Sequence, residues 1–218
     1  MAEKETRNER VYAGIRAEIL TGLRKPGEPL RTAELCKTFE CSVGVARESL
    51  LRLAERDLVE ERPMQGFRVV SLSTADLDDL TEARLEIETL ALRYSVRQGD
   101  AAWEARLVGA HHLLSVTPRQ EEGGAQPYSA AWGKAHGAFH TALIDGCRNR
   151  HLLAVALRLR DKGELYRRWS VAAPQPGRDV PAEHRGLLDA VLARDADLAA
   201  ARLTAHLEAT HQVLARGL

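Results

Sequence analysis

The sequence predicts a mainly α-helical protein in two parts, a small N-terminal domain that ends in a β-hairpin and a C-terminal all-α helical bundle. Within residues 32–70, two short helical patterns are followed at once by an alternating hairpin pattern. From residue 74 to residue 216 the periodicity is helical throughout, with no strand signal. We therefore expect one domain at residues 8–72 and a second at residues 73–218.

The first helix is expected from about Asn8 to Gly22. Its apolar residues recur at helical spacing and form one stripe, made of Val11, Ile15, Ile19, Leu20 and Leu23. Gly22 is suited to end the helix. The segment 24–29 contains two prolines and a glycine, so it is expected to turn rather than to continue the helix.

Two more helices follow this turn. Residues 33–39 are apolar at helical spacing, and Ser42 is placed to cap the next helix through its side-chain oxygen. That helix carries its apolar residues on one side, at Val45, Leu50, Leu53 and Ala54. The pattern alone is also compatible with an amphipathic helix pair in an ordinary core.

A hairpin favours the more specific interpretation. Residues 58–62 alternate, residues 63–66 hold turn chemistry, and residues 67–70 return as a second strand. Two helices with a basic-tipped hairpin make a winged helix-turn-helix, in which the second helix enters the DNA major groove and the wing approaches the backbone or minor groove. Double-stranded DNA is therefore the expected partner.

Composition excludes several other classes. The 218 residues carry a formal net charge of zero, and residues 1–75 hold 13 Lys/Arg against 12 Asp/Glu, which argues against a non-specific DNA coat. Three cysteines without a CxxC pair indicate reduced thiols. No signal sequence or membrane-length apolar run is recognised, so we expect a cytoplasmic protein without membrane contact.

The second domain is expected to be a bundle of about six helices joined by mostly short loops. The helical patterns cover about residues 74–97, 101–116, 129–147, 150–169, 181–194 and 196–216. The segment between them at residues 121–126 is the loop that we expect to be most mobile.

All eight histidines lie in this second domain. His136 and His140 are four residues apart, so their rings leave the same face of one helix, a spacing that can hold a divalent metal. If the helices surround one axis, His184 and His206 can join them. The alternative is that these histidines are surface residues or carry single hydrogen bonds. Cys147, two turns from His140, is expected to be a buried structural thiol.

The chain resembles the GntR family of bacterial transcription regulators. Residues 11–70 are similar to its DNA-binding domain, through Pro26-Gly27-x-x-Leu30-Arg31, Arg47-Glu48-x-Leu50-x-x-Leu53 and Gly66-Phe67-x-Val69. Residues 74–216 are similar to the FCD-type helical ligand-binding domain of the FadR-like subfamily, through Ala83-Arg84-Leu85-x-Ile87-Glu88, Phe139-His140-x-Ala142-Leu143 and Glu183-His184.

The resemblance implies DNA contacts from the loop before the motif, from the recognition helix and from the wing tip. The residues expected there are Arg31, Ser42, Gly44, Arg47, Arg52, Gln65 and Gly66. Many relatives have a second arginine where this chain has Val43, so its operator is expected to differ from the common one. For Arg47 the alternative is a salt bridge with Glu48 or Asp57.

The resemblance also implies a metal site. Relatives use one Asp and three His, and the Asp position holds His136 in this chain. His140, His184 and His206 therefore carry over as ligands, with His136 as a substituted fourth. Four imidazoles suit zinc or nickel. The alternative is that His136 binds the effector and no metal is held.

For the effector, Arg84 matches a family arginine that meets a carboxylate, and we group it with His136 and Arg167 as effector-binding residues. The alternative for Arg84 is an exposed partner of Glu88. The pattern is most similar to carbon-starvation-induced regulators, some of which answer to short dicarboxylates such as glutarate.

These expectations combine into a homodimeric repressor that binds a pseudo-palindromic operator and is released by a small organic acid. One alternative is a metal-dependent hydrolytic enzyme on the same bundle, but no well-placed carboxylate base stands out near His136 or His140. A second alternative is a regulator whose metal has a purely structural role.

Overall fold

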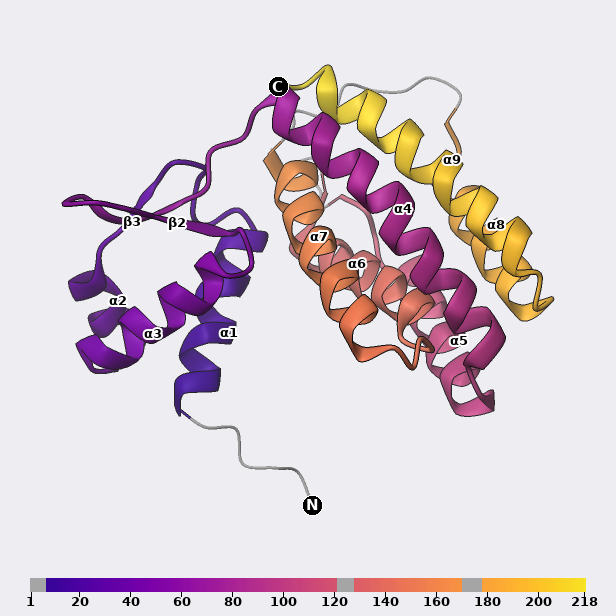
Figure 1. Ribbon diagram of the computed structural model, residues 1–218, viewed down its shortest axis with the longest axis horizontal. Coiled ribbons are helices and arrows are strands. Elements are labelled where there is room, and N and C mark those ends of the chain that lie inside the picture. The colour runs from indigo at the N-terminus through magenta and orange to yellow at the C-terminus, as the bar shows by residue number, and fades with distance from the viewer. Residues whose placement is uncertain (1–6, 121–127, 170–177) are drawn as a thin grey trace. The chain divides into compact units, whose positions relative to one another are not determined.

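The computed structural model describes residues 7–120, 128–169 and 178–218, which form two compact units (Figure 1). The first unit contains the chain up to Ser73 together with Glu164–Trp169, and the second contains Thr74–Gly163 and the C-terminal segment. The loop expected at residues 121–126 lies outside the described residues. Glu164–Trp169, which the sequence assigned to the bundle, thus groups with the N-terminal unit.

The first unit combines three helices with a small sheet. Its elements are α1 (Arg7–Leu20), β1 (Pro29–Leu30), α2 (Thr32–Thr38), α3 (Val43–Ala54), β2 (Val59–Arg62) and β3 (Gly66–Val69). The sheet is antiparallel with the order β1-β3-β2, so the central strand is the return strand of the wing. Strand β1 was not predicted, because two residues are too few to show alternation. Its Leu30 pairs with Phe67 across the sheet.

Local chemistry positions α3. The Ser42 Oγ accepts a hydrogen bond from the Val45 N–H at 3.4 Å, which confirms the predicted cap. Ile15, Leu35 and Leu50 are fully buried and hold the three helices together. At the wing tip, Gly66 has φ +79°, a left-handed conformation that glycine adopts without strain.

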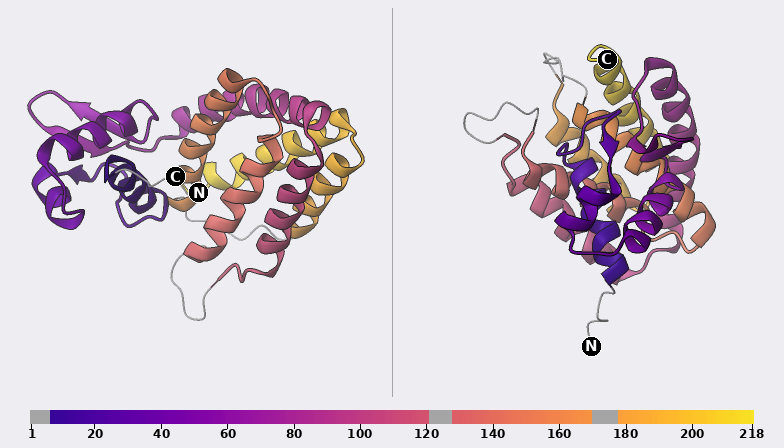
Figure 2. Two further views of the ribbon diagram at one scale, coloured as in Figure 1. Left: turned by 90° about the horizontal axis from the view of Figure 1, so that it is seen from below. Right: turned by 90° about the vertical axis from the view of Figure 1, so that its left-hand side faces the viewer.

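The second unit is all helical over its described residues, as predicted. Its helices are α4 (Thr74–Gln98), α5 (Ala101–Val116), α6 (Ala130–Ile144), α7 (Arg150–Trp169, of which the last six residues belong to the first unit), α8 (Val180–Leu192) and α9 (Ala196–Ala215). Helix α4 packs along α9, and α5 packs along α6 (Figure 2). The helix starts carry side-chain caps at Asp100, Ser129, Asp179 and Asp195.

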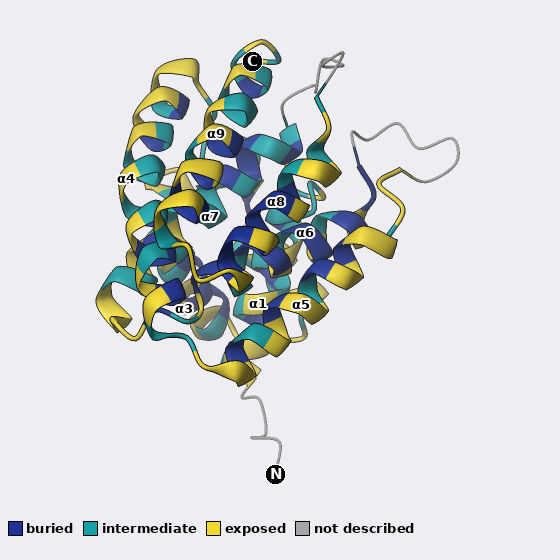
Figure 3. Cartoon of the chain, turned by 90° about the vertical axis from the view of Figure 1, so that its right-hand side faces the viewer, coloured by how far each residue is buried: buried dark blue, intermediate teal, exposed yellow. Residues whose placement is uncertain are grey.

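The buried residues of these helices lie on the faces that meet other helices, and the exposed ones lie on the outer faces (Figure 3). Trp103, Phe139 and Leu187 are buried in one continuous core. Helices α6, α8 and α9 also turn histidines into this interior. In the described part of the chain, no helix has the length and apolar character required to cross a membrane.

Candidate metal centre and nucleic-acid interface

Four histidines from three helices converge inside the second unit. His136 and His140 come from α6, His184 from α8 and His206 from α9, and all four are buried. One ring nitrogen of each lies within 4.8 Å of the corresponding nitrogens of the others. The convergence that the spacing allowed is therefore present. We call these residues the histidine quartet.

The donor set of the quartet fits a transition metal. Zinc–nitrogen bonds of about 2.0–2.1 Å place two ligand nitrogens of a tetrahedral site about 3.3–3.4 Å apart. The Nε2 atoms of His140 and His184 are 3.2 Å apart, close to this separation. Four imidazole nitrogens suit zinc or nickel better than magnesium or calcium, which prefer oxygen ligands.

Glu183 and Arg178 orient one member of the quartet. The His206 Nδ1 atom is 2.7 Å from the Glu183 Oε2 atom, so this ring nitrogen carries the proton and donates a hydrogen bond to the carboxylate. The Nε2 atom of His206 is then the one that keeps a lone pair. Arg178 holds Glu183 through two hydrogen bonds of 2.7 and 2.8 Å. Burial alone would raise the pKa of Glu183, but the hydrogen bonds from Arg178 and His206 outweigh it and lower that pKa to about 2.

Burial also favours the neutral form of two members of the quartet, His140 and His206. It lowers the pKa of His140 well below the usual value, and the neighbouring His206 and His184 lower it further. Burial lowers the pKa of His206 as well, although Glu183 opposes this shift. Neutral imidazole is the form that binds a metal, so the folded bundle presents these two rings ready to ligate at neutral pH.

Aromatic rings enclose the quartet. The Trp132 indole stacks on His136, with ring centroids 4.8 Å apart and an interplanar angle of 25°. Phe139 meets both His140 and His184 edge to face. Sequence reasoning missed Trp132, although its position four residues before His136 on α6 was the available signal.

Arg84 is engaged in a buried ion pair. Its Nε atom is 2.5 Å from the Glu88 Oε1 atom, and Glu88 is only 1% exposed. Arg160 approaches the other oxygen of Glu88 at 3.5 Å. The alternative partner Glu88 is therefore present, but the pair is buried rather than exposed as that alternative assumed. The buried Glu88 carboxylate was not predicted.

Arg167 lies elsewhere. It forms an ion pair with Glu164, and both residues group with the first unit rather than with the unit that holds the quartet. The expected effector contact of Arg167 stays a prediction. Cys147 is buried, as expected of a structural thiol.

In the first unit, most of the residues expected to contact DNA are exposed. They are Arg31, Ser42, Gly44, Arg47, Gln65 and Gly66. Arg47 forms a salt bridge of 3.1 Å with Glu61 of the wing, rather than with the expected alternatives Glu48 or Asp57. Its guanidinium also lies 5.7 Å from the centroid of the Phe67 ring. These contacts orient Arg47 at the junction of α3 and the wing.

Arg52 occupies a different face of α3. It lies five positions after Arg47, which corresponds to a rotation of about 140° around the helix. Its guanidinium lies 4.3 Å from the centre of the Tyr12 ring and pairs with Glu9 at 3.3 Å, so it packs on α1. These contacts hold Arg52 against α1, and its expected DNA contact stays a prediction.

Family models match both units. Residues 7–69 match the bacterial regulatory proteins of the gntR family, and residues 79–209 match the FCD domain. BphR of Paraburkholderia xenovorans LB400, an uncharacterised HTH-type transcriptional regulator, is 35% identical over 210 residues, covering 94% of this chain and 84% of BphR. GlaR of Escherichia coli K12, an HTH-type transcriptional repressor, is 32% identical over 200 residues, covering 90% of each chain.

Solved structures show the same fold. The structure of E. coli McbR/YncC aligns with a TM-score of 0.80 over 97% of this chain and 98% of that one, at 21% identity. A GntR transcriptional regulator from Rhodococcus sp. RHA1 aligns with a TM-score of 0.78 over 97% and 99% of the two chains, also at 21% identity.

The winged helix-turn-helix joined to a helical bundle defines a DNA-binding transcription regulator. This chain belongs to the GntR family and carries the FCD domain of its FadR-like branch. The relatives that match along most of its length are transcription regulators rather than enzymes, so the hydrolytic alternative is set aside.

Proposed function

We propose that the protein is a homodimeric repressor that releases its operator when it binds an effector. The effector would be a small organic acid with one or two carboxylates, bound beside a divalent metal that the histidine quartet holds. The DNA-binding part is residues 8–72, and residues 73–218 bind the effector and the second protomer. The quartet carries this proposal, because four buried imidazoles with ring nitrogens within 4.8 Å of one another are a costly arrangement without a ligand.

His136, His140, His184 and His206 would hold a zinc or nickel ion. A bound ion would supply a positive charge that attracts a carboxylate. The chain's own residues do the rest. Glu183 fixes the tautomer and ring orientation of His206, and Arg178 fixes Glu183. Trp132 stacks on His136 and limits the orientations that its ring can take.

On the DNA side, α3 is the recognition helix. Arg47 is exposed on it, and a guanidinium can pair with guanine O6 and N7 through two hydrogen bonds. Ser42, Gly44 and the wing tip at Gln65 and Gly66 approach the DNA backbone or groove. Two protomers related by a two-fold axis would read a pseudo-palindromic operator. The relative GlaR is described as a repressor, which supports the same direction of control here.

Effector and DNA oppose each other through one coupling free energy. If the organic acid weakens operator binding by some factor, operator DNA must weaken acid binding by the same factor. A purely structural metal would stabilise the bundle without this coupling. Operator affinity of the metal-loaded protein, measured with and without saturating acid, separates the effector-binding role of the metal from the structural role.

The first test is the metal content of untagged protein, measured by elemental mass spectrometry. We expect about one zinc or nickel per chain in wild type. His140→Ala should lose the metal, whereas the matched variant His151→Ala, which changes an exposed histidine of α7, should keep it. Metal-free wild type, or full occupancy in His140→Ala, would contradict the metal site.

The second test is a gel shift with DNA from upstream of the chain's own gene, run with and without metal. Specific retardation of a fragment that contains an inverted repeat would support the regulator. Binding that does not discriminate between this fragment and random DNA would contradict it.

A further inference from the structure

Two of the three cysteines lie at the turn that joins α2 to α3 in the first unit. Cys36 belongs to the last turn of α2, and Cys41 comes directly before Ser42, the cap of α3. Both are free thiols, and both residues are half-buried against the apolar core of the unit. A small solute therefore has access to both residues, which we call the thiol pair.

The backbone at the end of α2 brings the thiol pair together. The Cys41 N–H donates a hydrogen bond of 3.1 Å to the Cys36 carbonyl, and Glu40 between them has a left-handed φ of +48°. This pattern is a Schellman cap, in which the side chains of the two hydrogen-bonded residues commonly contact each other. Here both of those residues are cysteines.

The Cys41 side chain is directed back onto α2. Its Sγ atom is 4.0 Å from the Leu35 carbonyl oxygen, and its thiol is within hydrogen-bond reach of the Cys36 side chain. Leu35 is the residue that precedes Cys36 in the chain. The two sulfur atoms are therefore held near each other by local structure, as the formation of a disulfide requires.

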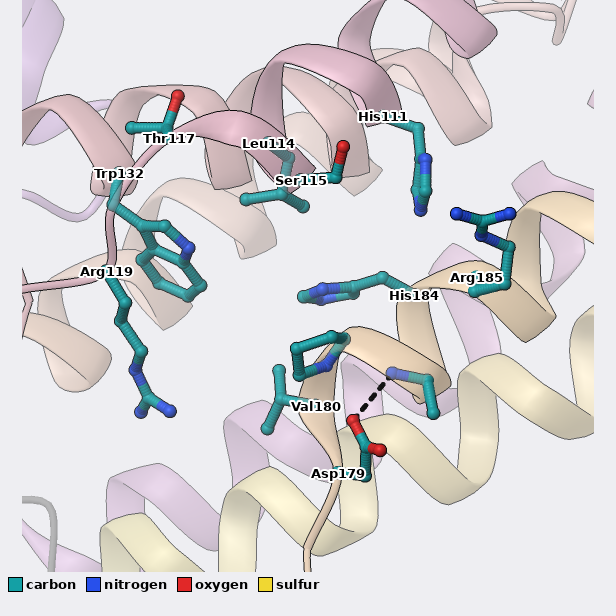
Figure 4. Close-up of a pocket in the computed structure, with 12 residues that line it drawn as sticks. His111, Leu114, Ser115, Thr117, Arg119, Trp132, Asp179, Val180, His184 and Arg185 are labelled. Atoms are coloured by element: carbon teal, nitrogen blue, oxygen red, sulfur yellow. Dashed lines mark hydrogen bonds between the residues drawn. The ribbon is translucent and has the colours of Figure 1, made fainter.

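The thiol pair is separate from the candidate metal centre. A cavity of about 460 Å³ adjoins the histidine quartet, and His184 and Trp132 form part of its wall (Figure 4). This cavity belongs to the second unit, whereas the thiol pair belongs to the first. A change at the thiol pair therefore acts on the DNA-binding unit and requires neither metal nor effector.

We propose that the thiol pair is an oxidation site, at which a peroxide joins Cys36 to Cys41 in a disulfide and thereby weakens DNA binding. One thiolate attacks a peroxide oxygen, which breaks the O–O bond, forms a sulfenic acid and releases hydroxide. The second sulfur then attacks the sulfenic sulfur, and water leaves as the S–S bond forms. The proton given up by the first thiol neutralises the hydroxide, so hydrogen peroxide is reduced to water while the two thiols are oxidised.

The surroundings of the two thiols assign the order of attack. Partial burial raises the pKa of the Cys41 thiol, and the neighbouring Cys36 thiol raises it further. Because the thiolate is the attacking form, the raised pKa disfavours a first attack by Cys41 at neutral pH. Cys36 then carries the sulfenic acid, and Cys41 closes the disulfide.

The disulfide changes the start of the recognition helix. It holds the two sulfur atoms about 2.05 Å apart, closer than two unbonded sulfur atoms can lie, so the thiol pair must shift. Ser42 follows Cys41 directly and shifts with it. Since the Ser42 Oγ accepts from the Val45 N–H at 3.4 Å, a small displacement breaks this cap. The exposed residues at this end of α3, Ser42 and Gly44, then lose the placement that DNA contacts require.

The first measurement is the chemical state of the full-length protein after treatment with hydrogen peroxide. Intact mass spectrometry should show the loss of one hydrogen from each of two thiols. Trypsin cleaves after Lys37, so a non-reducing digest should contain two peptides joined through Cys36 and Cys41 that separate on reduction. A disulfide between two chains, or sulfinic acid on one cysteine beside a free thiol on the other, would contradict the intrachain disulfide.

The second measurement is DNA affinity of the same preparation before oxidation, after oxidation and after reduction with dithiothreitol. The DNA is the upstream fragment selected by the gel shift. We expect the oxidised protein to bind at least about tenfold more weakly, the size of one lost base contact, and reduction to restore the affinity. An unchanged affinity in fully disulfide-linked protein would overturn the effect on DNA binding.

Three serine variants locate the response. Cys36→Ser and Cys41→Ser should each show no disulfide and no change of DNA affinity that dithiothreitol reverses. Cys147→Ser, which changes the buried thiol of the second unit, should respond as wild type does. Because each ratio compares one preparation with itself, differences in intrinsic affinity between variants cancel.

A wild-type response in Cys36→Ser or Cys41→Ser would refute the thiol pair as the oxidation site. Failure of the proposed regulator is read separately, since reduced wild type would then not discriminate the upstream fragment from random DNA. In that case mass spectrometry still decides whether the disulfide forms.

Discussion

His136 is the single residue that most changes the chemistry of the quartet. The resemblance places an Asp at this position in relatives, whereas this chain presents a buried imidazole stacked on Trp132. Replacing a carboxylate by an imidazole removes one negative charge from the ligand set and makes it softer. The site should therefore prefer zinc or nickel over manganese more strongly than a site with a carboxylate ligand.

One substitution should weaken this preference for zinc or nickel over manganese. We expect His136→Asp to retain metal but to take up more manganese when zinc and manganese are offered together, because carboxylates suit the harder ion. Elemental mass spectrometry after such a competition measures the ratio. His136→Ala, which removes the ligand without adding an oxygen, is the control and should lower occupancy of both ions. An unchanged ratio in His136→Asp would mean that this side chain does not ligate the metal.

Arg47 is the second residue whose own contacts lead to a prediction, and this one concerns DNA binding. Its guanidinium is held by Glu61 in an exposed pair, and Glu61 adds a negative charge where DNA phosphates would approach. We expect Glu61→Gln to tighten operator binding about two- to fivefold, the range of an exposed ion pair. Arg47→Gln should weaken operator binding about 10- to 100-fold and weaken binding to random DNA much less.

Fluorescence anisotropy with operator and random duplexes at one salt concentration measures both effects. Glu55→Gln, at the exposed end of α3, serves as the charge-matched control for Glu61→Gln and should change operator affinity less. Equal losses of operator and random binding in Arg47→Gln would assign this residue to a phosphate rather than to a base.

At the scale of elements, two helical glycines of the bundle respond oppositely to the same change. Gly163 in α7 lies against the Arg84 guanidinium, whereas Gly109 in α5 has nothing within 4 Å of an added Cβ. In a helix interior, alanine makes the free energy of the helix about 1 kcal/mol more favourable than glycine does. Gly109→Ala should therefore stabilise the bundle by up to about that amount.

Gly163→Ala should destabilise the bundle by about 1–3 kcal/mol, because the new methyl group displaces Arg84 from the buried Glu88. Urea unfolding of both variants measures the two signs. If Gly163→Ala is as stabilising as Gly109→Ala, the Arg84 guanidinium moves aside without weakening its pair with Glu88.

The helices were predictable from sequence because periodicity and caps are local properties. Ser42 illustrates this, since a cap needs only its own residue and the next three. Strand β1 was not predictable, because two residues acquire strand character only by pairing with β3. The tertiary structure, rather than the local sequence, determines that this segment is a strand.

The candidate site was predictable in part for the same reason. The spacing of His136 and His140 on one helix is visible in sequence, but their approach to His184 and His206 depends on the packing of three helices. The Arg84–Glu88 pair is visible in the sequence as an i,i+4 spacing, but the burial of Glu88 was not foreseen, since charged residues in helices are usually exposed. Only the fold brings Arg160 of α7 to the same carboxylate. The cavity beside His184 has no sequence signal, because packing alone creates it.

At the scale of the whole molecule, the buried ionisable groups predict how stability depends on pH. His140 and His206 have pKa values below the usual 6.5 in the folded protein, so near pH 6 the unfolded chain binds more protons than the folded one. Stability of the metal-free protein should therefore fall as pH drops from 7 to 5, by at most about 1.4 kcal/mol per pH unit for each group.

Glu183 adds a second window at lower pH. Its pKa is about 2 in the folded protein and 4.5 ordinarily, so the stability that it contributes is present above pH 4.5 and is lost as pH falls toward 2.

Thermal unfolding of chelator-treated protein between pH 7 and 5 isolates the contribution of the histidines from that of Glu183. His140→Gln should flatten the dependence there, while His151→Gln, which changes an exposed ring, should leave it as in wild type. A slope that is the same in His140→Gln and wild type would show that the His140 ring is not held neutral by burial.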